Sequence, residues 1–325
     1  MNIHVLADAK QAKSISIVVP VYNEEAAIKP FLDRITKVMT GLPAGVEYRI
    51  IFVNDGSTDA TEIVLHGLAA QNEQVTLINL SRNFGKEAAL MAGLDMAPGD
   101  AVIPMDVDLQ DPPELILDFV ERWLNGAKVV NARRIDRSQD SWLKRQSASS
   151  FYRLYNALAD RPIPENVGDF RLLDRQVVDV VRSLGERARF NKALFSWVGF
   201  DAEEVTYERP ARKEGTTSWS YWKLWNFALD GIFASSTTPL RVWGYVGFLM
   251  AIASFLYAVT ILVTTMIGGR DTPGYASTLI VILTFGGLNM IALGIIGEYV
   301  GRIYKEVRQR PLYVVRSSVN HSGEN

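Results

Sequence analysis

Two long apolar stretches near the C-terminal end limit what this chain can fold into. Residues 244–267 contain no ionisable side chain other than Tyr245 and Tyr257, and residues 278–296 contain none. A helix of roughly 20 apolar residues spans the hydrocarbon core of a bilayer, and helices of soluble proteins rarely continue this long without a polar face. The sequence therefore predicts two transmembrane helices, with a buried core hairpin as the alternative.

Basic residues flank the two stretches asymmetrically. Arg241 precedes the first stretch, and the loop 268–277 between the two has only Arg270 beside Asp271. Four basic residues follow the second stretch: Arg302, Lys305, Arg308 and Arg310. Because cytoplasmic segments carry the excess of Lys and Arg, both ends of the chain are expected in the cytoplasm and the loop outside. The N-terminal residues lack an apolar core followed by a cleavage site, so a cleaved signal peptide is not expected.

The composition excludes several classes of protein. The 325 residues carry a formal net charge of -2, which argues against nucleic acid as the main partner. The chain has no cysteine, so disulfides, thiolate metal ligands and a cysteine nucleophile are excluded. It contains neither a Gly-x-Gly-x-x-Gly motif nor a Gly-x-x-x-x-Gly-Lys phosphate loop, which leaves a nicotinamide cofactor and ATP hydrolysis without support.

Residues 15–132 alternate short β-branched runs with segments of helical periodicity. This alternation is typical of an α/β domain with a mostly parallel sheet. The expected strands are Ile15–Pro20, Tyr48–Asn54, Val75–Leu80, Asp100–Met105 and Lys128–Ala132. The helices expected between them are Glu24–Met39, Thr58–Ala70, Glu87–Met96 and Pro113–Asn125.

A polar motif follows each of the first four strands. Ligands of parallel sheets bind beyond the carboxyl ends of the strands, so the four motifs are expected to converge. They are residues 22–25 (Tyr-Asn-Glu-Glu), 55–59 (Asp-Gly-Ser-Thr-Asp), 81–86 (Ser-Arg-Asn-Phe-Gly-Lys) and 105–114 (Met-Asp-Val-Asp-Leu-Gln-Asp-Pro-Pro-Glu).

Asp106 and Asp108 in the fourth motif are candidates for a metal site. They alternate through one residue at the end of a strand, so an extended chain directs both carboxylates the same way. Mg²⁺ binds through one or two carboxylates together with substrate phosphates. Alone, the pattern is weak evidence, because acidic residues at strand ends are usually solvated turn or cap residues.

Residues of the other motifs also have structural alternatives. Ser57 or Thr58 could cap the helix that follows them, and Asn23 could cap the helix after the first strand. Arg82 and Lys86 could be solvated surface charges or could meet a diphosphate. The sequence leaves these alternatives open.

Taken together and in this order, the four motifs resemble those of family 2 glycosyltransferases with the GT-A fold. Within that family the chain is most similar to the polyprenyl-phosphate glycosyltransferases, which include the Gtr-type glucosyltransferases of bacteria and dolichol-phosphate mannose synthase. The resemblance runs from Ile15 to about Tyr313 and includes the apolar stretches. The domains expected are a cytoplasmic GT-A domain over 1–220, an interfacial helix over 221–235, a transmembrane hairpin over 241–302 and a cytoplasmic tail over 303–325.

The resemblance implies roles for individual residues. Donor-binding positions are Pro20, Tyr22, Glu24, Asp55, Lys86, Asp106 and Arg212. Asp106, Asp108 and Gln110 match the cluster that holds Mg²⁺ or Mn²⁺ and the diphosphate. The candidate catalytic carboxylates are Asp169, in the segment 168–172, and Asp108. Arg212 belongs to a segment that resembles a loop closing over the donor, although Ser218 stands where a basic residue commonly follows.

The resemblance also implies an acceptor-phosphate site, whose positions match Arg133, Arg145 and Ser149. Arg145 and Ser149 lie four residues apart on a helix expected over 142–158, which carries an apolar stripe. A second stripe over 221–235 is typical of a helix lying in the membrane interface. Packing of both stripes on the α/β domain is the alternative.

The sequence is thus interpreted as an inverting, metal-dependent enzyme of the bacterial inner membrane. It would transfer one hexose from a nucleoside-diphosphate sugar to undecaprenyl (polyprenyl) phosphate, and UDP-glucose is the expected donor because segments 171–175 and 222–231 look most like Gtr-type members. Mannose, an N-acetylhexosamine or an aminopentose stay open, as does a homo-oligomer. A processive synthase would carry Gln-x-x-Arg-Trp, but Phe119 stands three residues before Arg122. A non-catalytic scaffold or translocator is the alternative from another class.

Overall fold

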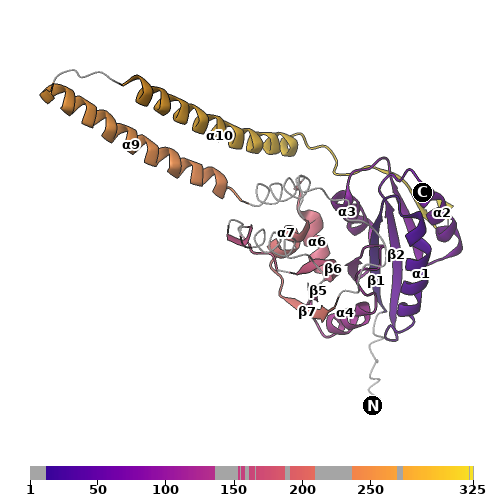
Figure 1. Ribbon diagram of the computed structural model, residues 1–325. Coiled ribbons are helices and arrows are strands. Elements are labelled where there is room, and N and C mark those ends of the chain that lie inside the picture. The colour runs from indigo at the N-terminus through magenta and orange to yellow at the C-terminus, as the bar shows by residue number, and fades with distance from the viewer. Residues whose placement is uncertain are drawn as a thin grey trace, which may run out of the picture. The chain divides into compact units, whose positions relative to one another are not determined.

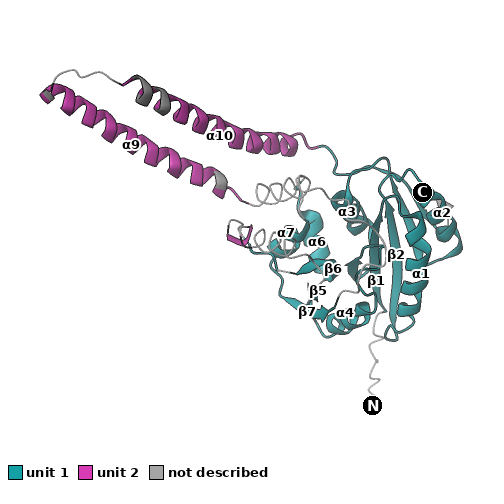
Figure 2. Cartoon of the chain, in the orientation of Figure 1, with its two compact units in different colours: residues 1–152, 161–218, 310–325 teal, residues 153–160, 219–309 magenta. Residues whose placement is uncertain are grey.

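The computed structural model describes residues 12–135, 153, 155–157, 161–164, 166–186, 191–208, 236–268, 274–321 and 323–324. The chain forms two compact units (Figure 2), one of residues 1–152, 161–218 and 310–325 and the other of residues 153–160 and 219–309. The helix predicted over 142–158 is described only at 153 and 155–157. The helix predicted over 221–235 lies outside the described residues, as do Arg145, Ser149 and Arg212.

The first unit is built on a sheet whose centre is parallel (Figure 1). Strand β1 (Lys13–Val21) lies between β2 (Val46–Asn54) and β4 (Ala101–Pro104), and β3 (Val75–Leu80) pairs with β2. Alternate side chains of β1 enter opposite cores, with Ile17 on one face and Val18 on the other. Both faces of these strands are therefore buried, which explains their continuous apolar runs.

Four helices, one after each of these strands in the chain, cover the two faces of the sheet. They are α1 (Glu25–Met39), α2 (Thr61–Gln71), α3 (Lys86–Met96) and α4 (Leu115–Leu124). Helices α1, α2 and α4 contribute to the core on one face, and α3 contributes to the core on the other. The predicted α/β domain is confirmed, with element ends shifted by up to three residues.

A strand that the sequence pattern did not predict lies between β4 and β5 (Val129–Arg134). It is β6 (Val167–Asp174), which pairs antiparallel with both neighbours. Phe170 and Leu172 of β6 enter one core and Leu173 enters the other, so this strand is central despite its charged residues. Strand β7 (Ala202–Tyr207) then pairs with β5 in parallel. The insertion of β6 brings Asp169 into the middle of the sheet.

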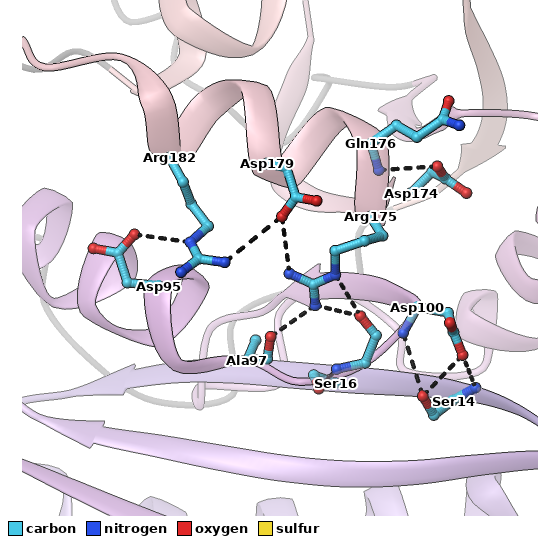
Figure 3. A network of polar contacts seen from close by, with 11 residues as sticks. Ser14, Ser16, Asp95, Ala97, Asp100, Asp174, Arg175, Gln176, Asp179 and Arg182 are labelled. Atoms are coloured by element: carbon cyan, nitrogen blue, oxygen red, sulfur yellow. Dashed lines mark hydrogen bonds and ion pairs between the residues drawn. The ribbon is translucent and has the colours of Figure 1, made fainter.

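Helix α6 (Arg175–Ser183) is joined to the C-terminal end of α3 by a polar network (Figure 3). Arg175 donates to the carbonyl oxygens of Ala97 and Gly99 at 2.7 and 2.9 Å. Arg182 lies 3.4 Å from a carboxylate oxygen of Asp95. Cations stabilise the carbonyl end of a helix, so this network fixes the end of α3 opposite to Lys86.

The C-terminal segment, predicted as a tail over 303–325, adds two strands to the sheet of the first unit, which the sequence pattern did not predict. Strand β8 (Val315–Asn320) pairs antiparallel with β3, and β9 (Gly323–Glu324) pairs with β8. The described strands thus form one sheet of order β7-β5-β6-β4-β1-β2-β3-β8-β9. The physical reason is that an edge strand such as β3 would leave its peptide groups unpaired, and Val319 adds a side chain that is buried in the core.

The second unit contains α9 (Thr238–Gly268) and α10 (Tyr275–Val307). Residues Leu240–Ile267 and Val281–Val307 are long and apolar enough to cross a membrane, by length and composition. None of the most apolar window of either helix is buried in the structure. Both helices extend beyond the apolar stretches from which they were predicted. The short helix α7 (Asn191–Trp197) belongs to the first unit.

Candidate active site

Asp55, directly after β2, connects two of the strand-end loops. Its carboxylate is buried and accepts hydrogen bonds from the backbone N–H groups of Phe84 at 2.7 Å and Gly85 at 2.9 Å. Burial raises the pKa of Asp55, and the two N–H donors oppose this shift. The residue predicted to bind the donor therefore also holds the loop that leads into α3.

Asn23 connects the loops after β1 and β2. Its side-chain oxygen accepts from the backbone N–H of Thr58 at 2.8 Å, and its own N–H donates to Ser57 Oγ at 3.0 Å. Helix α2 begins only at Thr61, whose backbone N–H donates to Asp59 Oδ1 at 3.0 Å. Capping by Ser57 or Thr58 is thus ruled out, because both bind across the site to Asn23.

Gly56 lies where two loops touch. Its φ is +68°, and a Cβ atom there would lie 2.4 Å from the carbonyl carbon of Arg82. Backbone contacts this close admit only glycine. The loops after β2 and β3 are therefore fixed relative to each other.

We expect Gly56→Ala to destabilise the protein by about 1–3 kcal/mol through overpacking, added to about 1–2 kcal/mol for left-handed backbone. Gly45 is the matched control, because its φ is +83° but nothing lies within 4 Å of an added Cβ. Gly45→Ala should show the backbone cost alone. Chemical unfolding of the two variants, followed by fluorescence, measures the difference, and equal destabilisation would contradict the close loop contact.

Lys86 joins two of the predicted site carboxylates. It is the first residue of α3, and its Nζ lies 2.7 Å from Oδ1 and 2.8 Å from Oδ2 of Asp106 at the end of β4. The same nitrogen lies 3.0 Å from Oδ2 of Asp169 in β6. Three elements that are distant in the sequence thus place one cation between two carboxylates.

The electrostatics of this group follow from burial and charge. Partial removal from water disfavours the charged form of Lys86, but Asp106 and Asp169 outweigh this effect and raise the pKa of the ammonium. Burial also disfavours the ionised form of Asp169, yet Lys86 and Lys192 lower its pKa to about 2. Asp169 is therefore an anion throughout the physiological range. Its Oδ1 is buried without a hydrogen-bond partner among the described residues.

Further carboxylates surround Asp106. Burial raises its pKa, and Asp169 and Asp108 add to that shift against the pull of Lys86. Burial likewise raises the pKa of Glu24, helped by Asp108 and Asp106. The loops after β1 and β4 thus bring negative charge together, which favours a cation.

The residues present fit a divalent metal that is shared with a diphosphate. Among the described residues, no group of three or more His, Cys, Asp or Glu could hold a metal ion by itself. Asp106 and Asp108 supply hard carboxylate oxygens, and Mg²⁺ is usually held by one or two carboxylates plus substrate phosphates. The donor set therefore suits Mg²⁺ or Mn²⁺ bound together with a substrate.

Hydrogen bonds of Asp108 and Asp111 stabilise the turn that carries Asp108. Leu109 has a left-handed φ of 53°, and Asp108 Oδ1 accepts from the backbone N–H of Gln110 at 3.1 Å. Asp111 accepts a hydrogen bond from the hydroxyl of Tyr207 in β7. Burial and Asp111 raise the pKa of Tyr207 to about 12, so the hydroxyl keeps its proton. Sequence reasoning missed Tyr207, because nothing local connects β7 to this turn.

Three further predicted residues lie at the end of β1 and in β5. Pro20 and Tyr22 stand at the end of β1, and Tyr22 is exposed. Arg133 lies 2.7 Å from a carboxylate oxygen of Glu204, so the structure gives this arginine an acidic partner that the sequence did not predict.

A second contact that the sequence did not predict holds α7 against the start of α3. Asn191 donates its backbone N–H to the Glu87 carboxylate at 3.0 Å and its side-chain N–H to the Glu87 carbonyl oxygen at 3.2 Å. This places Lys192 where its charge lowers the pKa of Asp169. No sequence pattern links these two segments.

Two known family profiles match different parts of the chain. The profile of glycosyl transferase family 2 matches residues 16–182, which include every carboxylate of the site. The chain belongs to glycosyltransferase family 2. The profile of the GtrB C-terminal hairpin matches residues 238–303 of this glycosyltransferase, the region of α9 and α10.

Relatives of this glycosyltransferase cover nearly all of it. It is 49% identical to an uncharacterized glycosyltransferase of Synechocystis over 93% of this chain and 94% of the relative. It is also 49% identical to a prophage-derived bactoprenol glucosyl transferase of Shigella flexneri, over 94% of this chain and 98% of the relative. Among solved structures, a mannosyltransferase of Pyrobaculum calidifontis in complex with GDP-Man and Mn²⁺ is 17% identical, with a TM-score of 0.44 over 90% of this chain and 86% of that one. That likeness is too distant to bear on the ligands of this chain.

Proposed function

We propose that this glycosyltransferase transfers a single hexose from a nucleoside-diphosphate sugar to undecaprenyl (polyprenyl) phosphate, with inversion and with the help of a divalent metal. UDP-glucose is the proposed donor. The observation that carries the proposal is the group of Lys86, Asp106 and Asp169 in a chain that also has two membrane-length helices. The name of the Shigella relative, a bactoprenol glucosyl transferase, supports the same acceptor and sugar.

The reaction forms one bond and breaks one. An oxygen of the acceptor phosphate attacks the anomeric carbon, and the bond from that carbon to the nucleoside diphosphate breaks, which inverts the configuration. The second pKa of a phosphate monoester is about 6, so near neutral pH the acceptor is largely a dianion and needs no base. A metal held by Asp106 and Asp108, with Gln110 beside them, would neutralise charge on the leaving diphosphate.

We assign a separate role to each of the other residues of the site. Asp169 stays ionised, so we assign it to orienting the reacting groups and holding Lys86. Lys86 supplies positive charge where a diphosphate would lie. Glu24 and Asp55 are proposed to contact the nucleoside, and Arg212 to close over the donor. Asp55 can do so while it holds Phe84 and Gly85, because each carboxylate oxygen has a second lone pair.

We also propose a membrane topology. The helices α9 and α10 would cross the bacterial inner membrane with both termini in the cytoplasm, because the excess of basic residues lies outside the hairpin loop, which has only Arg270. The catalytic unit would then face the cytoplasmic leaflet, where an acceptor phosphate lies at the level of the headgroups.

One experiment separates this function from its alternatives. Purified full-length protein in detergent is incubated with labelled UDP-glucose, other labelled sugar nucleotides and polyprenyl phosphate, and the lipid fraction is analysed. We expect one labelled hexose per lipid. Transfer from another sugar nucleotide would correct the donor, and absence of transfer from all of them would favour a non-catalytic scaffold or translocator.

We expect Arg145→Ala to raise the apparent KM for polyprenyl phosphate about 10- to 150-fold, because a charge-assisted contact to phosphate is lost. The KM for the sugar nucleotide should change little. Steady-state kinetics with each substrate varied in turn measures both values. Arg153→Ala is the control, since Arg153 is exposed and near in sequence. An equal or larger effect on the donor would remove Arg145 from the acceptor site.

A further inference from the structure

Lys86 engages both carboxylate oxygens of Asp106, at 2.7 and 2.8 Å. A metal ion that binds Asp106 must displace this ammonium or share the carboxylate with it. Two cations on one carboxylate repel strongly at such distances. A divalent ion that arrives alone therefore meets a carboxylate whose charge is already compensated.

A divalent ion that arrives with a nucleoside diphosphate meets different conditions. The diphosphate carries anionic oxygens, to which a lysine ammonium binds well as a point charge. The side chain of Lys86 is 47% exposed, and its flexible stem allows Nζ to turn while α3 stays in place. Residues 88–94 of α3 are buried against the sheet, so the helix itself has little freedom to move.

We propose that Lys86 is a tethered counter-ion that makes the binding of metal and nucleoside diphosphate cooperative. Without nucleotide, the ammonium competes with a divalent ion for the Asp106 carboxylate. When metal and nucleotide bind together, the ammonium moves to the diphosphate. This inference rests on the proposed function. Lys86 is thereby a positioning residue for the metal and the donor.

Metal binding in the absence of turnover tests this role. Purified full-length protein in detergent is titrated with Mn²⁺, with and without UDP or GDP, while electron paramagnetic resonance reports the free Mn²⁺. We expect the nucleotide to raise the Mn²⁺ affinity of the wild type by roughly 5- to 150-fold, the usual range of coupling between two sites. Without nucleotide, Lys86→Met should bind Mn²⁺ more tightly than the wild type by a factor in the same range, and nucleotide should add less.

The control is Lys128→Met, which removes a lysine that lies 3.2 Å from Asp174 Oδ1, outside the site. It should bind Mn²⁺ as the wild type does. Lys86→Gln repeats the test if the methionine variant folds poorly. Equal or weaker Mn²⁺ binding by the Lys86 variants without nucleotide would overturn the inference, and so would the same gain in Lys128→Met. If neither UDP nor GDP affects the wild type, the proposed donor class fails, whereas the comparison without nucleotide still decides the role of Lys86.

Discussion

Asp108→Asn should leave a folded protein whose transfer rate is lower by roughly 100- to 1,000-fold, as when an electrostatic stabiliser of the transition state is removed. The side chain of Asp108 is exposed and accepts one backbone hydrogen bond from Gln110. The amide oxygen of asparagine can accept the same bond, so the turn should persist. The missing charge weakens the metal site proposed at Asp106 and Asp108, and the leaving diphosphate loses its compensation. Initial rates at saturating donor and acceptor measure the loss.

Chelation and a matched variant complete this test. Excess chelator should abolish transfer by the wild type, and added Mg²⁺ or Mn²⁺ should restore it. Asp118→Asn, an exposed aspartate in α4, should keep the wild-type rate. Full turnover in excess chelator would show that neither Asp106 nor Asp108 needs a metal for transfer.

Asp169→Asn should lower kcat by roughly 100-fold, the loss that a small misplacement of the reacting groups causes. The substitution keeps the shape of the side chain but removes the charge that holds Lys86 at 3.0 Å. Asp179→Asn, at an exposed carboxylate of α6, is the control and should leave kcat unchanged. Far-ultraviolet circular dichroism of both variants checks that the fold is kept.

The pH dependence identifies the nucleophile. Lys86 and Lys192 overcome the effect of burial and hold the pKa of Asp169 at about 2, so this carboxylate does not titrate near neutral pH. The rates of the wild type and of Asp169→Asn should therefore both rise through about pH 6, as the acceptor phosphate loses its second proton. A residual rate that is flat between about pH 5 and 8 would contradict a self-sufficient phosphate nucleophile.

The lowered pKa of Asp169 also links its charge to stability. A carboxylate whose folded pKa lies below its unfolded value of about 3.9 stabilises the fold above that pH. This contribution decreases as the pH falls towards 2. Asp169→Asn should therefore lose less stability on acidification than the wild type.

Features set by local periodicity could be predicted from the sequence. The apolar runs of β1 to β4, the helices between them and the two membrane-length helices each depend on residues that are neighbours in the chain. The convergence of Asp55 and Asp106 on one edge follows from the parallel order of β1, β2 and β4.

Only the tertiary structure decided which residues meet. Strand β6 was not predicted, because Asp169 and Arg171 interrupt its apolar run, and its place between β4 and β5 depends on antiparallel pairing across a long separation. The sequence of β8 indicates only a polar tail, because the strand forms by pairing with β3, which is distant in the sequence. The sequence left Lys86 open between a surface charge and a contact to a diphosphate. It becomes the counter-ion of Asp106 and Asp169 because packing of α3 and β6 on the sheet brings three distant segments within hydrogen-bond distance.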